Sequence, residues 1–138
     1  MAEIFDSSKA PDRQRFALEA AYLRQQAEEL NAQVQQLAAL FAENQAAQAA
    51  LGALAKASAA KEPSLSPLGA GVYAKTKPAG ESVVIEVGAR VAREASQSEA
   101  NAVLAERAKA IEKALGEARA ALSAALRRMD ELGALAQA

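Results

Sequence analysis

Apolar residues recur with a seven-residue period along the first part of the chain. The two recurring positions hold Phe16, Leu23, Leu30, Leu37, Asn44 and Leu51, and Ala20, Ala27, Val34, Phe41 and Gln48. This spacing is an a/d seam, the pattern of a helix that pairs with another helix, with polar interruptions at Asn44 and Gln48. Because residues 12–60 contain no proline and only one glycine, we expect a single long helix over this range.

The same period returns in the last part of the chain and predicts a second helix over residues 96–136. Its two seam positions hold Ala108, Leu115, Leu122, Met129 and Ala136, and Leu104, Ile111, Ala118, Ala125 and Leu132. Ser96 and Glu99 stand just before this run with the spacing of a capping box. Helices this long with so narrow an apolar face are expected to pair with each other.

The connector, residues 61–95, differs in composition from both helices. It holds three of the four prolines and four of the seven glycines, together with a cluster of valines. Alternation predicts strands over residues 64–68, 72–76, 83–87 and 90–93, with turns at Gly69–Gly71 and Gly88–Ala89. Since isolated hairpins are marginal in water and Val84 makes the second face apolar too, we expect other chains to cover this region. The residues assigned to subunit assembly are Leu68, Val72, Tyr73, Val83, Val84, Ile85, Val87 and Val91.

Composition narrows the function classes further. Alanine supplies 39 of the 71 apolar residues, so a thick globular core is not expected. The chain has no cysteine and no histidine, which removes thiolate nucleophiles, the commonest general base and the commonest transition-metal ligand. Sixteen basic and seventeen acidic residues give a net charge of −1, which disfavours nucleic acid as a partner. We therefore expect a protein without catalytic residues, cofactor, metal or membrane span.

The beginning and the end of the chain carry a few apolar residues of their own. Ile4 and Phe5 lie upstream of the first helix, and Leu132 and Leu135 lie near the end of the second. In an antiparallel hairpin these four residues would meet at the tip opposite the connector. There they would either contact unfolded chains or simply close the end of the coiled coil. The start of the chain resembles no secretory leader, so we expect a cytoplasmic protein.

The connector and the start of the second helix resemble the alpha-type subunit of prefoldin, a co-chaperone. The matching segments are Pro67–Lys75, Val83–Val91 and Ser98–Ala100. In that family a Pro-Leu-Gly-x-Gly turn enters one hairpin, and a valine-rich strand ending in Val-Gly opens a second. Arg90 departs from the family, which usually has a small residue there, and Ala74 and Ala92 replace larger strand residues.

This resemblance implies one domain over residues 1–138, mainly α with a small β part. Its two helices would form an antiparallel coiled coil, joined by two β-hairpins that assemble into an intersubunit β-barrel. The family resemblance implies a hexamer with two alpha-type and four prefoldin beta-type subunits. It further implies an ATP-independent chaperone subunit. Such a subunit would hold non-native polypeptides at the tips of its coiled coil and deliver them to a group II chaperonin.

Two other function classes remain open at this point. A scaffold or adaptor would bind one defined partner helix and have no general affinity for unfolded chains. A coiled-coil arm that grips structured RNA is disfavoured by the balanced charge, and its binding would collapse with rising salt.

Overall fold

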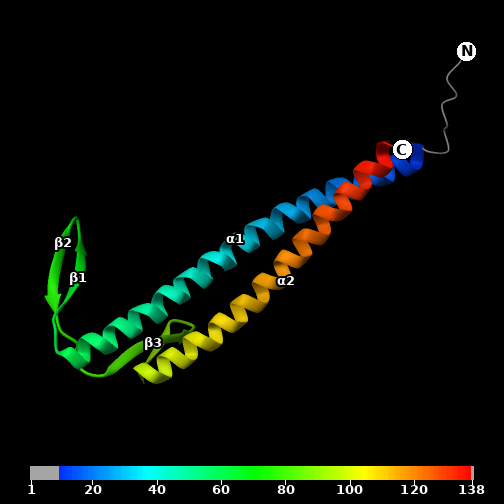
Figure 1. Ribbon diagram of the computed structural model, residues 1–138. Coiled ribbons are helices and arrows are strands. Elements are labelled where there is room, and N and C mark those ends of the chain that lie inside the picture. The colour runs from blue at the N-terminus through cyan, green and yellow to red at the C-terminus, as the bar shows by residue number, and fades with distance from the viewer. Residues whose placement is uncertain (1–9, 138) are drawn as a thin grey trace, which may run out of the picture. The chain divides into compact units, whose positions relative to one another are not determined.

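The computed structural model describes residues 10–137, and its architecture confirms the predicted one: two long helices joined by two β-hairpins (Figure 1). The elements are α1 (Ala10–Ala60), β1 (Ser64–Gly69), β2 (Val72–Thr76), β3 (Ser82–Gly88), β4 (Val91–Ser96) and α2 (Gln97–Gln137). Each predicted helix and strand is present, and most boundaries lie within one or two residues of the prediction.

Local capping explains where the helices meet the connector. Lys61 adopts φ +57° after the last residue of α1, and the Glu62 amide donates to the Ala57 carbonyl at 3.3 Å. This left-handed residue with its backward hydrogen bond is a Schellman ending. At the start of α2, the Glu99 amide donates to Ser96 Oγ at 3.0 Å, as the capping box predicts.

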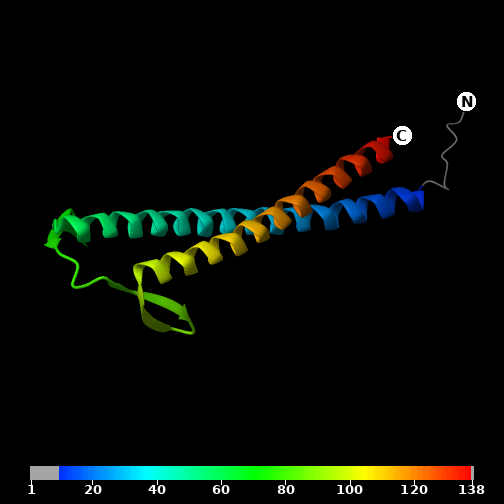
Figure 2. The same ribbon diagram turned by 60° about the horizontal axis from the view of Figure 1, so that its bottom comes forward.

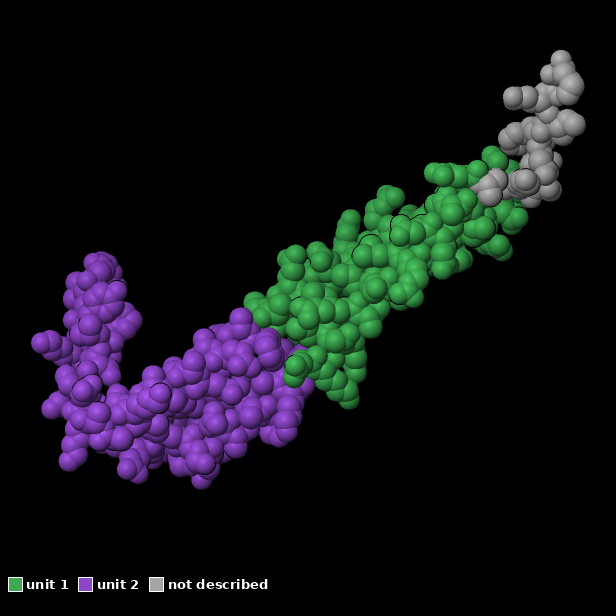
Figure 3. Space-filling model, viewed as in Figure 1, with its two compact units in different colours: residues 1–39, 112–138 green, residues 40–111 purple. Residues whose placement is uncertain are grey.

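The chain divides into two compact units, each holding one stretch of both helices (Figure 3). The described part of the first comprises residues 10–39 and 112–137, and the second comprises residues 40–111. Within each unit the two stretches run antiparallel (Figures 1 and 2). Every predicted seam residue is buried or half-buried except Ala136, which is exposed. The heptad pattern therefore identified the contact face of both helices.

The two hairpins are built on the same plan. In the first, Gly69 pairs with Val72 and the register shifts between Pro67 and Gly69, so Leu68 is a bulge. In the second, Gly88 pairs with Val91 and Val87 is the bulge. Two residues with positive φ close each turn: Ala70 and Gly71 in the first, Ala89 and Arg90 in the second. Two-residue hairpin turns of this kind favour glycine or asparagine, because other side chains are strained at positive φ.

Replacing Arg90 by glycine is expected to stabilise the β3–β4 hairpin. Arg90 has φ +61°, whereas the equivalent residue of the first hairpin is already Gly71, at φ +79°. Relief of this strain exceeds the extra chain entropy of glycine, so we expect a gain of about 0.5–1 kcal/mol, measured by thermal unfolding. The reverse change, Gly71→Arg, is the matched control and should lower the melting temperature. A lower melting temperature for Arg90→Gly would contradict this explanation.

The β3–β4 hairpin covers the helices of its own chain with one face. Ile85, Ala95 and Ala100 are buried together, and Leu51, Val83 and Val103 pack against them. A side chain of α2 also reaches the hairpin, since Arg107 Nη2 donates to the Glu86 carbonyl at 2.6 Å. This small core fixes the second hairpin to the helices without a linker, because β4 ends at Ser96 and α2 begins at Gln97.

Candidate functional site

Most residues predicted to mediate subunit assembly lie on the surface of the chain. Val84 is 70% exposed on β3, opposite Glu94 of β4. The other exposed members of the predicted set are Leu68, Val72, Tyr73, Val87 and Val91. They occupy the strands and both bulges of the two hairpins. Covering these large apolar side chains with another chain would lower the free energy of the assembly.

Val83 and Ile85 occupy a different place from the rest of the assembly set. Ile85 is buried and Val83 is half-buried, both against helices of the same chain. These two members of the predicted assembly set are therefore covered within the chain. Strand alternation explains the difference, because Val83 and Ile85 point to one face of β3 and Val84 points to the other.

The two faces of the first hairpin differ, and the more exposed one carries Lys75 beside its large apolar side chains. Ser66 and Ala74 are half-buried, and Ser66 Oγ lies 2.9 Å from Thr76 Oγ1 on that side. The opposite face carries Leu65 and Tyr73, both exposed. Leu65 was not among the predicted assembly residues, although its alternation with Ser64 and Ser66 places it on the same face as Tyr73. Within the described chain both hairpins are two-stranded, so each presents strand edges that can pair further.

An apolar groove of about 340 Å³ lies between α1, α2 and β3. Its lining includes Leu51 and Leu54 of α1, Leu104 of α2, and Val83 to Glu86 of β3. Val84 is shared by this groove and the exposed face of β3, where Glu86 lies two residues along the strand and Glu94 lies opposite on β4. We call the exposed apolar residues of the two hairpins the head surface; they are Leu65, Leu68, Val72, Tyr73, Val84, Val87 and Val91.

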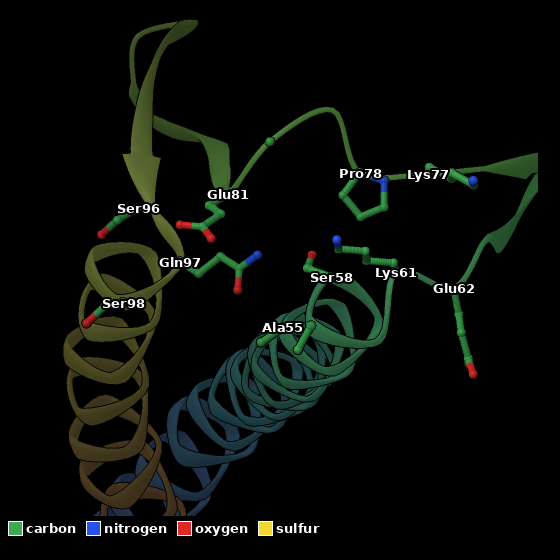
Figure 4. A pocket seen from close by; sticks show the side chains of 12 residues that line it. Ala55, Ser58, Lys61, Glu62, Lys77, Pro78, Glu81, Ser96, Gln97 and Ser98 are labelled. Atoms are coloured by element: carbon green, nitrogen blue, oxygen red, sulfur yellow. The ribbon is translucent and has the colours of Figure 1, made fainter.

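A second opening, of about 700 Å³, lies between the end of α1, residues 77–81 and the start of α2 (Figure 4). Lys61 and Gln97 point toward this space, whereas Glu62 and Lys77 point away from it. Ser58 Oγ is buried there without a hydrogen-bond partner among the described residues. The mixture of both charge signs favours no particular ligand.

Two features are absent from the described residues. Residues 10–137 contain no cluster of three carboxylates that could hold a metal ion. None of the helices in this range is apolar enough over a sufficient length to cross a bilayer. What the surface offers instead is exposed apolar area.

The predicted tip residues are found in contrasting environments. Leu132 is only 2% exposed and is part of the seam, whereas Leu135 is 47% exposed. Ile4 and Phe5 lie outside the described residues. Of the four predicted tip residues, Leu135 is thus the one the structure shows on the surface.

Near the same end of the helices, an ion pair joins α1 to α2. Arg128 donates to both carboxylate oxygens of Glu19, with Nε at 2.9 Å and Nη2 at 3.3 Å, and also contacts Glu131. The hydrogen bond from Arg128 lowers the pKa of the Glu19 carboxyl below its ordinary value. The pair is partly exposed, so it orients the helices more than it stabilises them.

In the unit formed by residues 10–39 and 112–137, three further large apolar residues are exposed that were not among the predicted site residues. Leu18 is 74% exposed and Tyr22 lies one helical turn further along α1, while Leu126 is exposed on α2. A signal for them was present, because each is a bulky apolar residue outside the seam positions of its heptad. We call Leu18, Tyr22, Leu126 and Leu135 the distal apolar residues.

Comparison with known proteins gives a family and a fold. Residues 23–138 match the family model described as "Prefoldin subunit". A chain from the cryo-EM structure of filamentous PFD from Methanocaldococcus jannaschii superimposes with a TM-score of 0.70. The two sequences are 21% identical, and the alignment covers 86% of this chain and 98% of that chain. Among curated proteins there is no match.

Proposed function

Because the chain belongs to the prefoldin family, whose members are non-enzymatic chaperones that hold unfolded proteins, we propose a division of labour between its two units. Residues 40–111, which we call the hairpin unit, assemble with other prefoldin subunits. Residues 10–39 and 112–137, which we call the distal unit, hold the unfolded polypeptide. The observation that carries this proposal is the exposure of large apolar side chains in both units of a chain that otherwise buries its seam.

The head surface supports the assembly role. Val84, the bulge residues Leu68 and Val87, and Tyr73 are apolar and exposed, and each hairpin has strand edges available for pairing. Neighbouring hairpins would supply hydrogen bonds to those edges and apolar cover for those faces. We propose that the neighbours are beta-type prefoldin subunits, in a hexamer with two alpha-type chains, in the cytoplasm.

The distal apolar residues support the client role. A non-native polypeptide exposes apolar segments of no fixed sequence, so a surface of separated apolar side chains suits it better than a deep pocket. Several subunits acting together would raise the effective concentration of weak contacts. Leu132 closes the coiled coil in this arrangement, while Leu135 contacts the client together with Ile4 and Phe5. Transfer to a group II chaperonin is the final step we propose.

The client role is tested by the double substitution Phe5→Ser and Leu135→Ser in the assembled protein. We expect weaker suppression of aggregation of a chemically denatured client protein, with unchanged oligomer mass, because Leu135 is exposed and contributes little to folding. Light scattering and native mass spectrometry measure the two quantities. Ala134→Ser, an exposed neighbour, is the matched control.

Two results would contradict the client role. Unchanged protection would place client contact elsewhere, and dissociation of the oligomer would make these residues structural. A wild-type protein that protects no client at all would favour an adaptor for one defined helix.

A further inference from the structure

Asn44 is the one buried polar residue among residues 10–137, with 7% of its surface exposed. It occupies a seam position of α1 that is otherwise apolar in most heptads. Its Nδ2 donates to the Leu104 carbonyl of α2 at 3.0 Å, and its Oδ1 accepts from Gln48 Nε2 at 2.6 Å. We propose that Asn44, held by Gln48, determines the axial register of α1 against α2.

The Leu104 carbonyl can be reached because a small residue lies over it. Side chains on a helix lean toward its N-terminus, so the residue four positions later covers a given carbonyl. For Leu104 that residue is Ala108, which leaves the oxygen open to the Asn44 amide. Sliding α2 by one heptad in one direction would place Asn44 beside Ile111, whose carbonyl lies under Leu115. The buried amide would then lose its partner, which is costly.

Sliding in the other direction is also unfavourable. Asn44 would then lie level with Gln97, the first residue of α2, and Leu51 would lie beyond the end of that helix. Only the observed alignment satisfies the Asn44 amide and keeps Leu51 in its core.

The apolar seam alone discriminates poorly between these alignments. In the distal unit the Glu19–Arg128 pair lies at an alignment that places Leu23 within one residue of the level of Ala125. After a slip of one heptad, Leu23 would face Ala118 or Leu132, which are equally apolar. In a heptad repeat, a slip of seven residues brings apolar seam residues opposite apolar seam residues again. A single polar residue in the seam commonly fixes the register of such helices.

The test measures register directly by pulsed electron paramagnetic resonance on the full chain. The protein has no native cysteine, so Ala53→Cys and Lys109→Cys can be spin-labelled without background. Both sites are exposed, and the observed alignment separates them by about 14 residues, or roughly 21 Å along the axis. We expect a single distance between the labels in the protein that carries only the two cysteine substitutions. In the same protein with Asn44→Leu, we expect a second population in which α2 is shifted by one heptad, about 10 Å along the axis.

Two further variants make the outcome decisive. Gly52→Ala, at an exposed helical glycine with open space around it, raises helix stability without touching the seam and should keep a single distance. Asn44→Ala removes the hydrogen bond with no added bulk and should also show the second population. A single, unchanged distance in both Asn44 variants would overturn the proposal. A second population in Gly52→Ala as well would overturn it too, because heterogeneity would then not depend on Asn44.

Discussion

Replacing Val84 by lysine is expected to dissociate the oligomer and leave the single chain folded. Val84 is exposed on β3 and lies directly opposite Glu94, so a lysine there can form a cross-strand ion pair in the free chain. In the assembled oligomer a neighbouring chain would cover the same ammonium group and remove it from water. An unfavourable term of about 3 kcal/mol, typical of a poorly paired buried charge, weakens association at least 100-fold. Native mass spectrometry of the protein with its partner subunits measures the loss.

The control for this experiment is Ala49→Lys, which adds the same charge on an exposed position of α1. It should assemble normally. Ile85→Lys, one residue away from Val84, should instead unfold the hairpin unit, since Ile85 belongs to the intrachain core. A Val84→Lys protein that keeps its full oligomeric mass would show that the exposed face of β3 is not an interface.

Leu132→Ala is expected to cost the chain the largest share of its stability among single substitutions at the distal end. Leu132 is the most buried large side chain described, and the Glu19–Arg128 alignment places Phe16 of α1 within one residue of its level. Removing a fully buried leucine side chain costs about 2 kcal/mol or more, because the apolar contacts are lost and a cavity remains. Denaturant unfolding measures the free energy, and hydrogen exchange locates the loss in residues 10–39 and 112–137.

Leu135→Ala is the matched control, three residues further along the same helix. Its side chain is about half exposed, so the free energy of unfolding should change by no more than about 0.5 kcal/mol. Equal losses for the two variants would mean that Leu132 does not close the coiled coil.

The elements of this fold were largely predictable from local signals. The heptad seam positions, such as those of Leu23 and Leu115, predicted the contact face of each helix, because two helices pair by burying their apolar stripes. The Gly69 and Gly88 turns and the Ser96 cap located the strand and helix ends, because positive φ and capping need particular residue types.

The site was harder to predict, because exposure depends on which face of a hairpin meets the helices. Val83 and Val84 are identical in type and adjacent, yet one packs inward and the other faces out. The valine run alone does not show which of the two faces the helices. The packing of Ile85 against Leu51 decides it, because Val83 lies on the same face of β3 as Ile85. Leu18 and Tyr22 were not predicted as site residues for another reason. Both lie outside the heptad seam, and the seam pattern alone says nothing about apolar residues at other heptad positions.

The direct junction between β4 and α2 has a mechanical consequence. Ser96 ends the strand and caps the helix at once, so no flexible residue separates them. The first hairpin, by contrast, is followed by residues 77–81, which include Pro78 and Gly80 and can absorb small rotations. A tilt imposed on the β3–β4 hairpin would therefore act as a lever on α2, and the fit between neighbouring subunits would set the direction in which that helix leaves them.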